Sequence, residues 1–278
     1  MRMRKKKKER LLAVITVVMS VFLILGGCVF KKTRTNGADE DNRPKIVIGC
    51  DDYTPFNYMD IDGNLVGIDV ELAREAFGRM GYQTKIIFIN WEEKKELLAS
   101  GKIDCVWSSF SIDGREADYR WAGPYMKSRQ VVAVNPDSSI RKLSDLERKI
   151  VAVQSTTKPE EIFRDLEKSG QKPELRKIIS VQNRDLLYTF LSKGYVDAVA
   201  AHDTSINQFM ADFDMKYRIL EEPLQEVHLG VAFDLHDERG LDKKLDETLK
   251  QMRQDGTIKA IVSKYLQNAE SYLGDEND

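Results

Sequence analysis

Residues 103–115 read IDCVWSSFSIDGR, an apolar run that continues into a polar loop. Ile103–Trp107 is typical of a buried strand, and Ser109, Ser111 and Arg115 come after it. In open α/β sheets, ligands bind beyond the carboxyl ends of the strands. Serine and glycine let backbone N–H groups point into a cavity, and arginine binds a carboxylate through two N–H groups at once. The stretch therefore predicts a carboxylate site, and the alternative is a turn with a solvated Arg115.

The residues before this stretch alternate between strand and helix patterns. Lys45–Gly49 and Lys85–Ile89 are short apolar strands, and apolar residues recur at helical spacing between Asp69 and Met80. Trp91–Ser100 is predicted as the next helix. Strands that are connected by helices form parallel sheets with right-handed crossovers. The chain therefore opens with a βαβαβ unit of the α/β class.

A second unit of the same kind follows after a loop predicted at Trp121–Met126 and a strand at Gln130–Val134. Its predicted strands and helices are Ile150–Gln154, Glu160–Lys168, Lys177–Val181, Asp185–Ser192 and Val196–Ala201. Both units place small polar residues at the carboxyl ends of their strands. Two such units can face each other across a cleft that holds a ligand.

The N-terminal residues have the layout of a signal peptide. Met1–Arg10 carries seven basic residues, and Leu11–Leu25 is apolar apart from Thr16 and Ser20. The apolar run is shorter than a comfortable membrane span, and it ends in LGGC, which resembles the bacterial lipobox. We therefore predict a lipoprotein signal peptide over 1–27, diacylation of Cys28 (palmitate) and a flexible tether over 28–44.

The alternative to this prediction is an N-terminal membrane anchor that is never cleaved. Both interpretations put the rest of the chain at the extracytoplasmic face of the cell membrane. Removal of residues 1–27 leaves 36 Lys and Arg residues against 44 Asp and Glu residues, a net charge of −8. An acidic domain without a basic patch argues against nucleic acid as a partner.

The cysteine and histidine residues form no recognisable metal motif. Cys50 and Cys105 lie at strand ends that are too far apart for a disulfide in parallel neighbours, so we predict buried free thiols. CxxC and HExxH motifs are absent from the sequence, and His202, His228 and His236 lack metal-like spacing. We therefore expect no metal and no cofactor.

Residues 45–267 resemble the extracellular solute-binding proteins of polar amino acid ABC transporters (family 3). The resemblance is carried by six segments: IVIGCDDYTPFNYMDIDGNLVGIDVELAREAFGRMGY, INWEEKKELLASGKIDCVWSSFSIDGRE, WAGPYM, LSDLERKIVAVQSTT, LSKGYVDAVAAHD and LKQMRQDGTIKAIVSKYL. It implies a two-lobed, periplasmic-binding-protein-like (type II) fold. Each lobe would be a mostly parallel sheet flanked by helices, and two crossing segments would join the lobes. Lobe 1 would comprise 45–130 and 231–268, lobe 2 would comprise 131–230, and 269–278 would be a polar tail.

The resemblance also implies a set of ligand contacts. Arg115 matches the arginine that clamps the ligand's carboxylate, and Ser109 and Ser111 match its hydroxyl and backbone donors. Thr156 and Thr157 match the second-lobe contacts to the same carboxylate. Tyr53 and Phe56, with Asp51 at the pocket edge, match the loop around the ligand side chain. The spacing around Arg115 is one residue shorter than the usual pattern, and Ser155 stands where the family has glycine.

The position that commonly holds an aspartate for the ligand's α-ammonium is His202 here, and Asp203 comes one residue later. Neutral histidine is a poorer partner for an ammonium group than a carboxylate. Two explanations stay open: a local bulge brings Asp203 into the site, or the ligand is not an ordinary α-amino acid.

The resemblance implies a monomeric, membrane-anchored binding component of an ABC importer, without enzymatic activity, that passes a small carboxylate-bearing solute to a permease. A polar amino acid is the expected solute. Two alternatives stay open: a ligand-sensing receptor module of the same fold, and a dehydratase-like enzyme. An enzyme would need a general acid or base in the cleft, and His202 and Asp203 keep that option open.

Overall fold

The computed structural model describes residues 42–273. The signal peptide, lipidated Cys28, most of the tether and the end of the polar tail were predicted in 1–41 and 274–278, which lie outside the described residues. Between residues 42 and 273, no helix has the length and apolar character that crossing a membrane requires.

The predicted βαβαβ unit is present. Strand β1 (Lys45–Cys50) pairs in parallel with β4 (Gln83–Phe88) on one side and with β5 (Cys105–Ser111) on the other. The connecting helices are α2 (Ile68–Arg79) and α3 (Lys94–Ala99). A hairpin and a turn of 3-10 helix complete this part: β2 (Tyr58–Met59), β3 (Leu65–Val66) and η1 (Trp91–Glu93).

The second unit has the same parallel arrangement, with β7 (Ile150–Gln154) between β8 (Lys177–Val181) and β9 (Ala198–His202). Its helices and remaining short elements are η2 (Leu143–Leu146), α4 (Lys158–Ser169), α5 (Asp185–Ser192), α6 (Asp203–Asp212) and β10 (Arg218–Ile219). Helix α6 was not predicted, because its sequence DTSINQFMAD has few apolar residues to reveal a helical period.

Two long antiparallel strands, β6 (Arg120–Val134) and β11 (Gln225–Phe233), run through both units. Among the described residues, nine strands form one mixed sheet in the order β4-β1-β5-β11-β6-β9-β7-β8, with β10 paired to β6. The loop predicted at Trp121–Met126 is wrong, because these residues belong to β6. The register shifts between Leu229 and Val231, so a bulge accommodates the Gly-Pro pair that looked like a turn.

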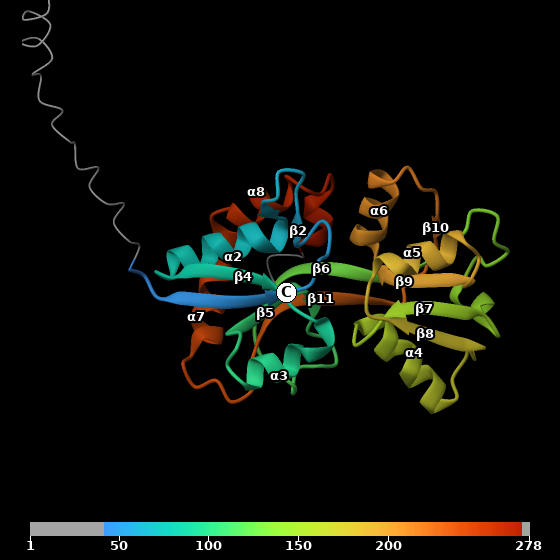
Figure 1. The fold of residues 1–278 in the computed structure, drawn as a ribbon, viewed down its shortest axis with the longest axis horizontal. Coiled ribbons are helices and arrows are strands. Elements are labelled where there is room, and N and C mark those ends of the chain that lie inside the picture. Colours follow the sequence, from blue (N-terminus) through green and yellow to red (C-terminus); the bar gives the residue numbers. More distant parts are fainter. Residues whose placement is uncertain (1–41, 274–278) are drawn as a thin grey trace, which may run out of the picture. The chain divides into compact units, whose positions relative to one another are not determined.

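The buried side chains form four clusters that fall into two groups. Two clusters cover opposite faces of the sheet with residues from 46–126 and 227–269, which we call the first half. The other two cover opposite faces with residues from 131–220, which we call the second half. Figure 1 shows α2 and α8 opposite α3 in the first half, and α5 and α6 opposite α4 in the second.

The C-terminal segment returns to the first half. Helices α7 (Leu241–Gln254) and α8 (Thr257–Val262) pack against α2 in its larger core cluster. The polar tail predicted from residue 269 is corrected at its start: η3 (Ala269–Tyr272) is a 3-10 helix, and Ala269 is buried in the same cluster. A small apolar side chain between polar neighbours gave little indication of this packing.

Cys50 and Cys105 are free and buried, as predicted. Burial raises the pKa of both thiols, because the low-dielectric interior disfavours the thiolate. Across residues 42–273, no group of three or more His, Cys, Asp or Glu side chains could hold a metal ion.

Candidate functional site

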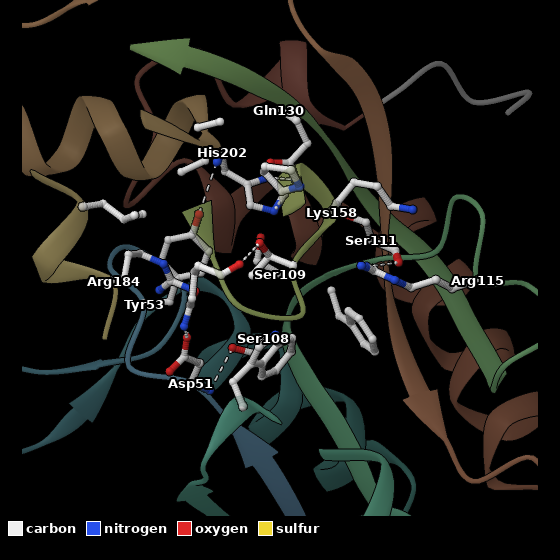
Figure 2. A pocket seen from close by; sticks show the side chains of 18 residues that line it. Asp51, Tyr53, Ser108, Ser109, Ser111, Arg115, Gln130, Lys158, Arg184 and His202 are labelled. Atoms are coloured by element: carbon white, nitrogen blue, oxygen red, sulfur yellow. Dashed lines mark hydrogen bonds and ion pairs between the residues drawn. The ribbon is translucent and has the colours of Figure 1, made fainter. Parts of the chain in front are cut away.

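A cavity lies where β5 ends, and both halves contribute to its lining (Figure 2). About 440 Å³ of space is free of protein atoms there, and part of that space is open to solvent. In the first half, Asp51 and Tyr53 follow β1, and Ser108, Ser109, Phe110 and Ser111 form the end of β5. In the second half, the lining includes Gln154 at the end of β7 and Ala200, Ala201 and His202 at the end of β9. The carboxyl ends of parallel strands thus meet at one site.

The serines at the end of β5 are held by a buried carboxylate. The backbone N–H of Ser109 donates to Oδ2 of Asp69 at 2.6 Å, and Asp69 lies in the first turn of α2. Ser109 has a φ of 48°, which a side chain other than glycine adopts only when its surroundings impose it. Burial raises the pKa of Asp69 to about 7, although its hydrogen bonds oppose the shift. Asp69 therefore fixes the backbone that presents Ser109 to the cavity.

Arg115 lies on one side of the cavity. Its side chain is 11% exposed, and its NH2 is 2.8 Å from Oε2 of Glu161 in α4. Lys158, at the start of the same helix, is 3% exposed and also pairs with Glu161. The Cζ of Arg115 is 5.2 Å from the centroid of the Phe110 ring, and burial lowers the pKa of its guanidinium. One carboxylate thus bridges two buried cations.

Arg184, directly before α5, lies on the other side of the cavity. Its NH2 is 2.8 Å from Oδ2 of Asp51 and also donates to Oε1 of Gln154. Its NH1 donates to the carbonyl of Asp52 at 3.1 Å. The Cζ of Arg184 lies 3.1 Å from the centroid of the Tyr53 ring, a cation–π contact. Gln154 also donates to Asp51 at 2.8 Å, so the three polar side chains form a closed network.

His202, at the end of β9, is a neutral lining residue. Nε2 of Gln130 lies 2.9 Å from Nε2 of His202. Nδ1 is 2.8 Å from Oγ of Ser128, so both ring nitrogens have a polar neighbour. Desolvation, together with the charge of Arg184, lowers the pKa of His202 to about 3. The imidazole therefore stays neutral at physiological pH.

Residues 46–268 match the family model of bacterial extracellular solute-binding proteins, family 3. The chain belongs to this family. It is 26% identical over 253 residues to the arginine-binding extracellular protein ArtP of Bacillus subtilis (strain 168), covering 88% of this chain and 97% of the relative. It is 30% identical over 234 residues to the histidine-binding periplasmic protein of Salmonella typhimurium (strain LT2), covering 80% and 87%.

Among solved structures, the ancestral amino acid-binding protein AncCDT-1, a precursor of cyclohexadienyl dehydratase, resembles the chain with a TM-score of 0.70. The identity is 26%, and the match covers 80% of this chain and 95% of that one. The predicted family and the predicted α/β solute-binding fold are confirmed.

Seven of the ten ligand contacts predicted for this family 3 protein line the cavity: Asp51, Tyr53, Ser109, Ser111, Arg115, Thr157 and His202. Phe56, Thr156 and Asp203 are not among the described lining residues. Phe56 is fully buried with its ring centroid 5.6 Å from that of Tyr53, so it supports the lining from behind. Oγ1 of Thr156 accepts instead from Lys94 at 2.8 Å. Ligand binding by each residue remains a prediction.

Asp203 is directed away from the cavity, because α6 begins directly at this residue. Its side chain is 1% exposed and lies 3.0 Å from Nε of Arg129. Tyr272 also donates to it, at 3.3 Å. The bulge that would have brought Asp203 into the site is absent from β9 and α6, and His202 keeps the lining position.

Sequence reasoning missed several lining residues of this solute-binding protein, namely Trp91, Ser108, Phe110, Gln130, Gln154, Lys158, Pro159, Arg184, Leu187, Ala200 and Ala201. Trp91 packs against Phe110 of β5 and also reaches the cavity. Gln154 ends β7 and Lys158 begins α4, so the rule for strand ends could have found both. Arg184 precedes α5 and gave no comparable signal.

Proposed function

We propose that this protein captures a small carboxylate-bearing solute of amino acid size and delivers it to the permease of an ABC importer. The observation that carries the proposal is the carboxylate of Glu161 between Arg115 and Lys158. Two buried cations at the edge of a cavity are suited to hold a carboxylate. The names of two relatives, an arginine-binding and a histidine-binding protein, support an amino acid as the solute.

A binding role is favoured over catalysis by the chemistry of the lining. His202 has a pKa of about 3, so it is a weak base and is not protonated at neutral pH. Asp203 pairs with Arg129 outside the cavity. We therefore propose a monomeric binding protein without enzymatic activity. Incubation with cyclic carboxylic acids should give no turnover, and measurable dehydration would contradict the proposal.

We also propose that the two halves act as lobes, 45–130 with 231–268 and 131–230, that close on the solute about β6 and β11. A solute that bridges both halves binds the closed form better, and this difference in affinity drives closure. Small-angle scattering at saturating solute should give a smaller radius of gyration. An unchanged radius would contradict lobe closure.

Membrane anchoring is the last part of the proposal and rests on the LGGC sequence that ends at Cys28. Diacylation of Cys28 would hold the protein at the extracytoplasmic face of the cell membrane. The substitution Cys28→Ala should release the protein or leave an unprocessed precursor. Wild-type protein in the soluble secreted fraction would contradict the anchor.

The central experiment is mass spectrometry of the small molecules that the purified protein releases on denaturation. We expect a carboxylate-bearing compound from the wild type and its loss from Arg115→Ala. Arg164→Ala is the matched control, because Arg164 lies on the exposed side of α4 and pairs only with Glu160 and Glu167 among described residues. A compound that Arg115→Ala retains would refute carboxylate capture.

A further inference from the structure

The charges on the two sides of the cavity are balanced differently. On one side, Asp51 lies 2.8 Å from Arg184, and this pair carries no net charge. On the other side, Glu161 pairs with both Arg115 and Lys158, so one positive charge remains there. That single charge suits the one carboxylate of the proposed solute. The Arg184 side needs no charged group from a ligand.

The guanidinium of Arg184 is held in place by the protein itself. Both hydrogens of its Nη2 are used, one by Oδ2 of Asp51 and one by Oε1 of Gln154. Its Nη1 donates to the carbonyl of Asp52 at 3.1 Å, and the side chain is 10% exposed. Arg184 is therefore a fixed part of the cavity wall and not a free donor for a ligand.

The same guanidinium covers the surfaces that a cationic side chain would bind. Asp51 and Tyr53 both line the cavity, and a carboxylate beside an aromatic ring is suited to hold a guanidinium or ammonium group. The Cζ of Arg184 lies 3.1 Å from the centroid of the Tyr53 ring. Figure 2 shows Arg184, Tyr53 and Asp51 together on one side of the cavity. Arg184 thus lies where the charged end of a basic ligand would bind.

Exclusion of a basic ligand follows from the origin of these residues. Arg184 belongs to the second half, whereas Asp51 and Tyr53 belong to the first. A basic side chain bound to Asp51 and Tyr53 would face Arg184 when both halves enclose the cavity, and like charges brought together weaken binding. Displacement of Arg184 would also remove its bonds to Gln154 and Asp52. An uncharged side chain meets neither cost.

We infer that Arg184 is a specificity-determining residue that occupies the position of a cationic side chain and thereby excludes basic amino acids. This inference rests on the proposed function and adds the charge of the solute opposite its carboxylate. The solute is uncharged at that end.

The first test is calorimetric titration of the full-length wild type with pairs of ligands that match in size. L-Citrulline has the shape of L-arginine without its side-chain charge, and L-norleucine has the shape of L-lysine without its side-chain charge. In at least one pair, we expect the uncharged member to bind about tenfold or more tightly than the cationic member. The compound that the wild type releases on denaturation should likewise carry no cationic side chain.

The substitution Arg184→Ala should admit basic ligands. Affinity for L-arginine should rise by about tenfold or more, because Asp51 loses its counterion and the ring of Tyr53 is uncovered. Affinity for L-citrulline should change much less. Arg184→Lys keeps a cation at this position and should still exclude L-arginine. Arg176→Ala, at an exposed loop residue, is the matched control and should change neither affinity.

A double variant separates the effect of charge from the effect of space. Asp51→Asn in the background of Arg184→Ala leaves the enlarged cavity and removes the anion. The ratio of L-arginine affinity to L-citrulline affinity should then fall back toward the wild-type ratio. A ratio that stays as high as in Arg184→Ala would mean that Asp51 is not the anion of this position, and the inference would be wrong.

Two further outcomes would overturn the inference. They are tighter binding of L-arginine or L-lysine than of its uncharged match by the wild type, and a folded Arg184→Ala in which the ratio of L-arginine to L-citrulline affinity does not rise. If Arg184→Ala does not fold, the wild-type pairs and the released compound decide. If the wild type binds no member of either pair, the appearance of L-arginine binding in Arg184→Ala supports the inference and its absence contradicts it.

Failure of this inference can be told apart from failure of the proposed function. Wild-type binding of L-arginine that Arg115→Ala abolishes would overturn the exclusion of basic ligands and leave carboxylate capture standing. Solute binding that Arg115→Ala leaves unchanged would contradict the proposed function, and with it the inference that rests on it.

Discussion

Arg115 and Arg184 lie on opposite sides of one cavity and are similar in almost every measure. Their side chains are 11% and 10% exposed, and each pairs at 2.8 Å with a carboxylate from the other half. Their partners differ. Glu161 is 34% exposed, whereas Asp51 is 18% exposed and is also bound by Gln154. Two equally buried arginines can therefore differ in how readily they bind a ligand. Arg115 is the more available of the two, because its partner Glu161 can move into water more easily than Asp51 can.

The largest expected effect is on solute affinity at Arg115. Arg115→Ala removes one of the two cations that hold the carboxylate, and truncation of a buried charge pair costs about 2–5 kcal/mol. Affinity for the solute released from the wild type should therefore fall by about 30- to 4,000-fold. Arg115→Lys should also bind weakly, because an ammonium group cannot reproduce the two-pronged geometry. Calorimetric titration measures the affinity of both variants. Tight binding by Arg115→Ala would mean that Arg115 is no more available to the solute than Arg184.

The contrast between the two sides also separates what the sequence predicts from what it does not. The strands Ile150–Gln154 and Lys177–Val181 and the helix Asp185–Ser192 were predicted with the bounds that the structure has. In each of these segments the apolar residues follow a clear pattern, and turn-forming residues mark both ends. Trp121–Met126 was wrong because a Gly-Pro pair is locally a turn, and only pairing with the distant β11 makes it a strand.

The same limit applies to the site. Arg115 was predicted because it follows a strand with small polar residues, a local pattern. Arg184 lies next to Asp51, 133 positions away in the sequence, and only the packing of the two halves brings them together. A local bulge was one way in which Asp203 could have entered the site beside His202, but α6 starts at Asp203 and its side chain pairs with Arg129. Local patterns locate the ends of strands, and tertiary contacts decide which long side chains reach the cavity.

The next effect concerns stability on the Arg115 side. Asp69→Ala leaves the backbone N–H of Ser109 buried without its acceptor, which should lower the free energy of unfolding by about 1–3 kcal/mol. Asp69→Asn is the control, because its amide oxygen can still accept from Ser109. Urea denaturation of both variants measures the difference. Equal stability of the two variants would show that Asp69 does not fix this backbone.

A pH-dependent effect is expected at Lys94, which contacts Thr156 of the second half. Burial lowers the pKa of Lys94 from about 10.5 to about 7. Between these values the unfolded chain binds a proton that the folded chain does not, so stability rises with pH. The rise from Lys94 alone is at most about 1.4 kcal/mol for each pH unit between 7 and 10.

Lys94→Met should lack this part of the pH dependence. Chemical denaturation of wild type and variant at pH 7 and pH 8 gives the change in unfolding free energy for each protein. We expect the wild type to gain more than Lys94→Met over this interval. The same gain in both proteins would mean that Lys94 remains charged in the folded chain.

The smallest effect gives the sharpest test of the comparison, because its sign is unusual. If Glu161 occupies the place of a ligand carboxylate, Glu161→Gln should raise solute affinity. A partly exposed ion pair contributes about 0.2–1 kcal/mol, so the gain is at most about fivefold. The free energy of unfolding should fall in the same variant, because Arg115 and Lys158 lose their anion. Higher affinity together with lower stability is the expected signature.

Glu167→Gln is the matched control, since Glu167 is 64% exposed on the same helix and pairs with Arg164. It should change neither affinity nor stability measurably. In the background of Arg115→Ala, the gain from Glu161→Gln should shrink, because removal of the Glu161 carboxylate no longer frees an arginine for the solute. Calorimetric titration of the four proteins in this cycle measures the coupling. A gain in affinity that persists without Arg115 would mean that Glu161 acts on the solute by charge repulsion. The partner carboxylates would then not explain the difference between Arg115 and Arg184.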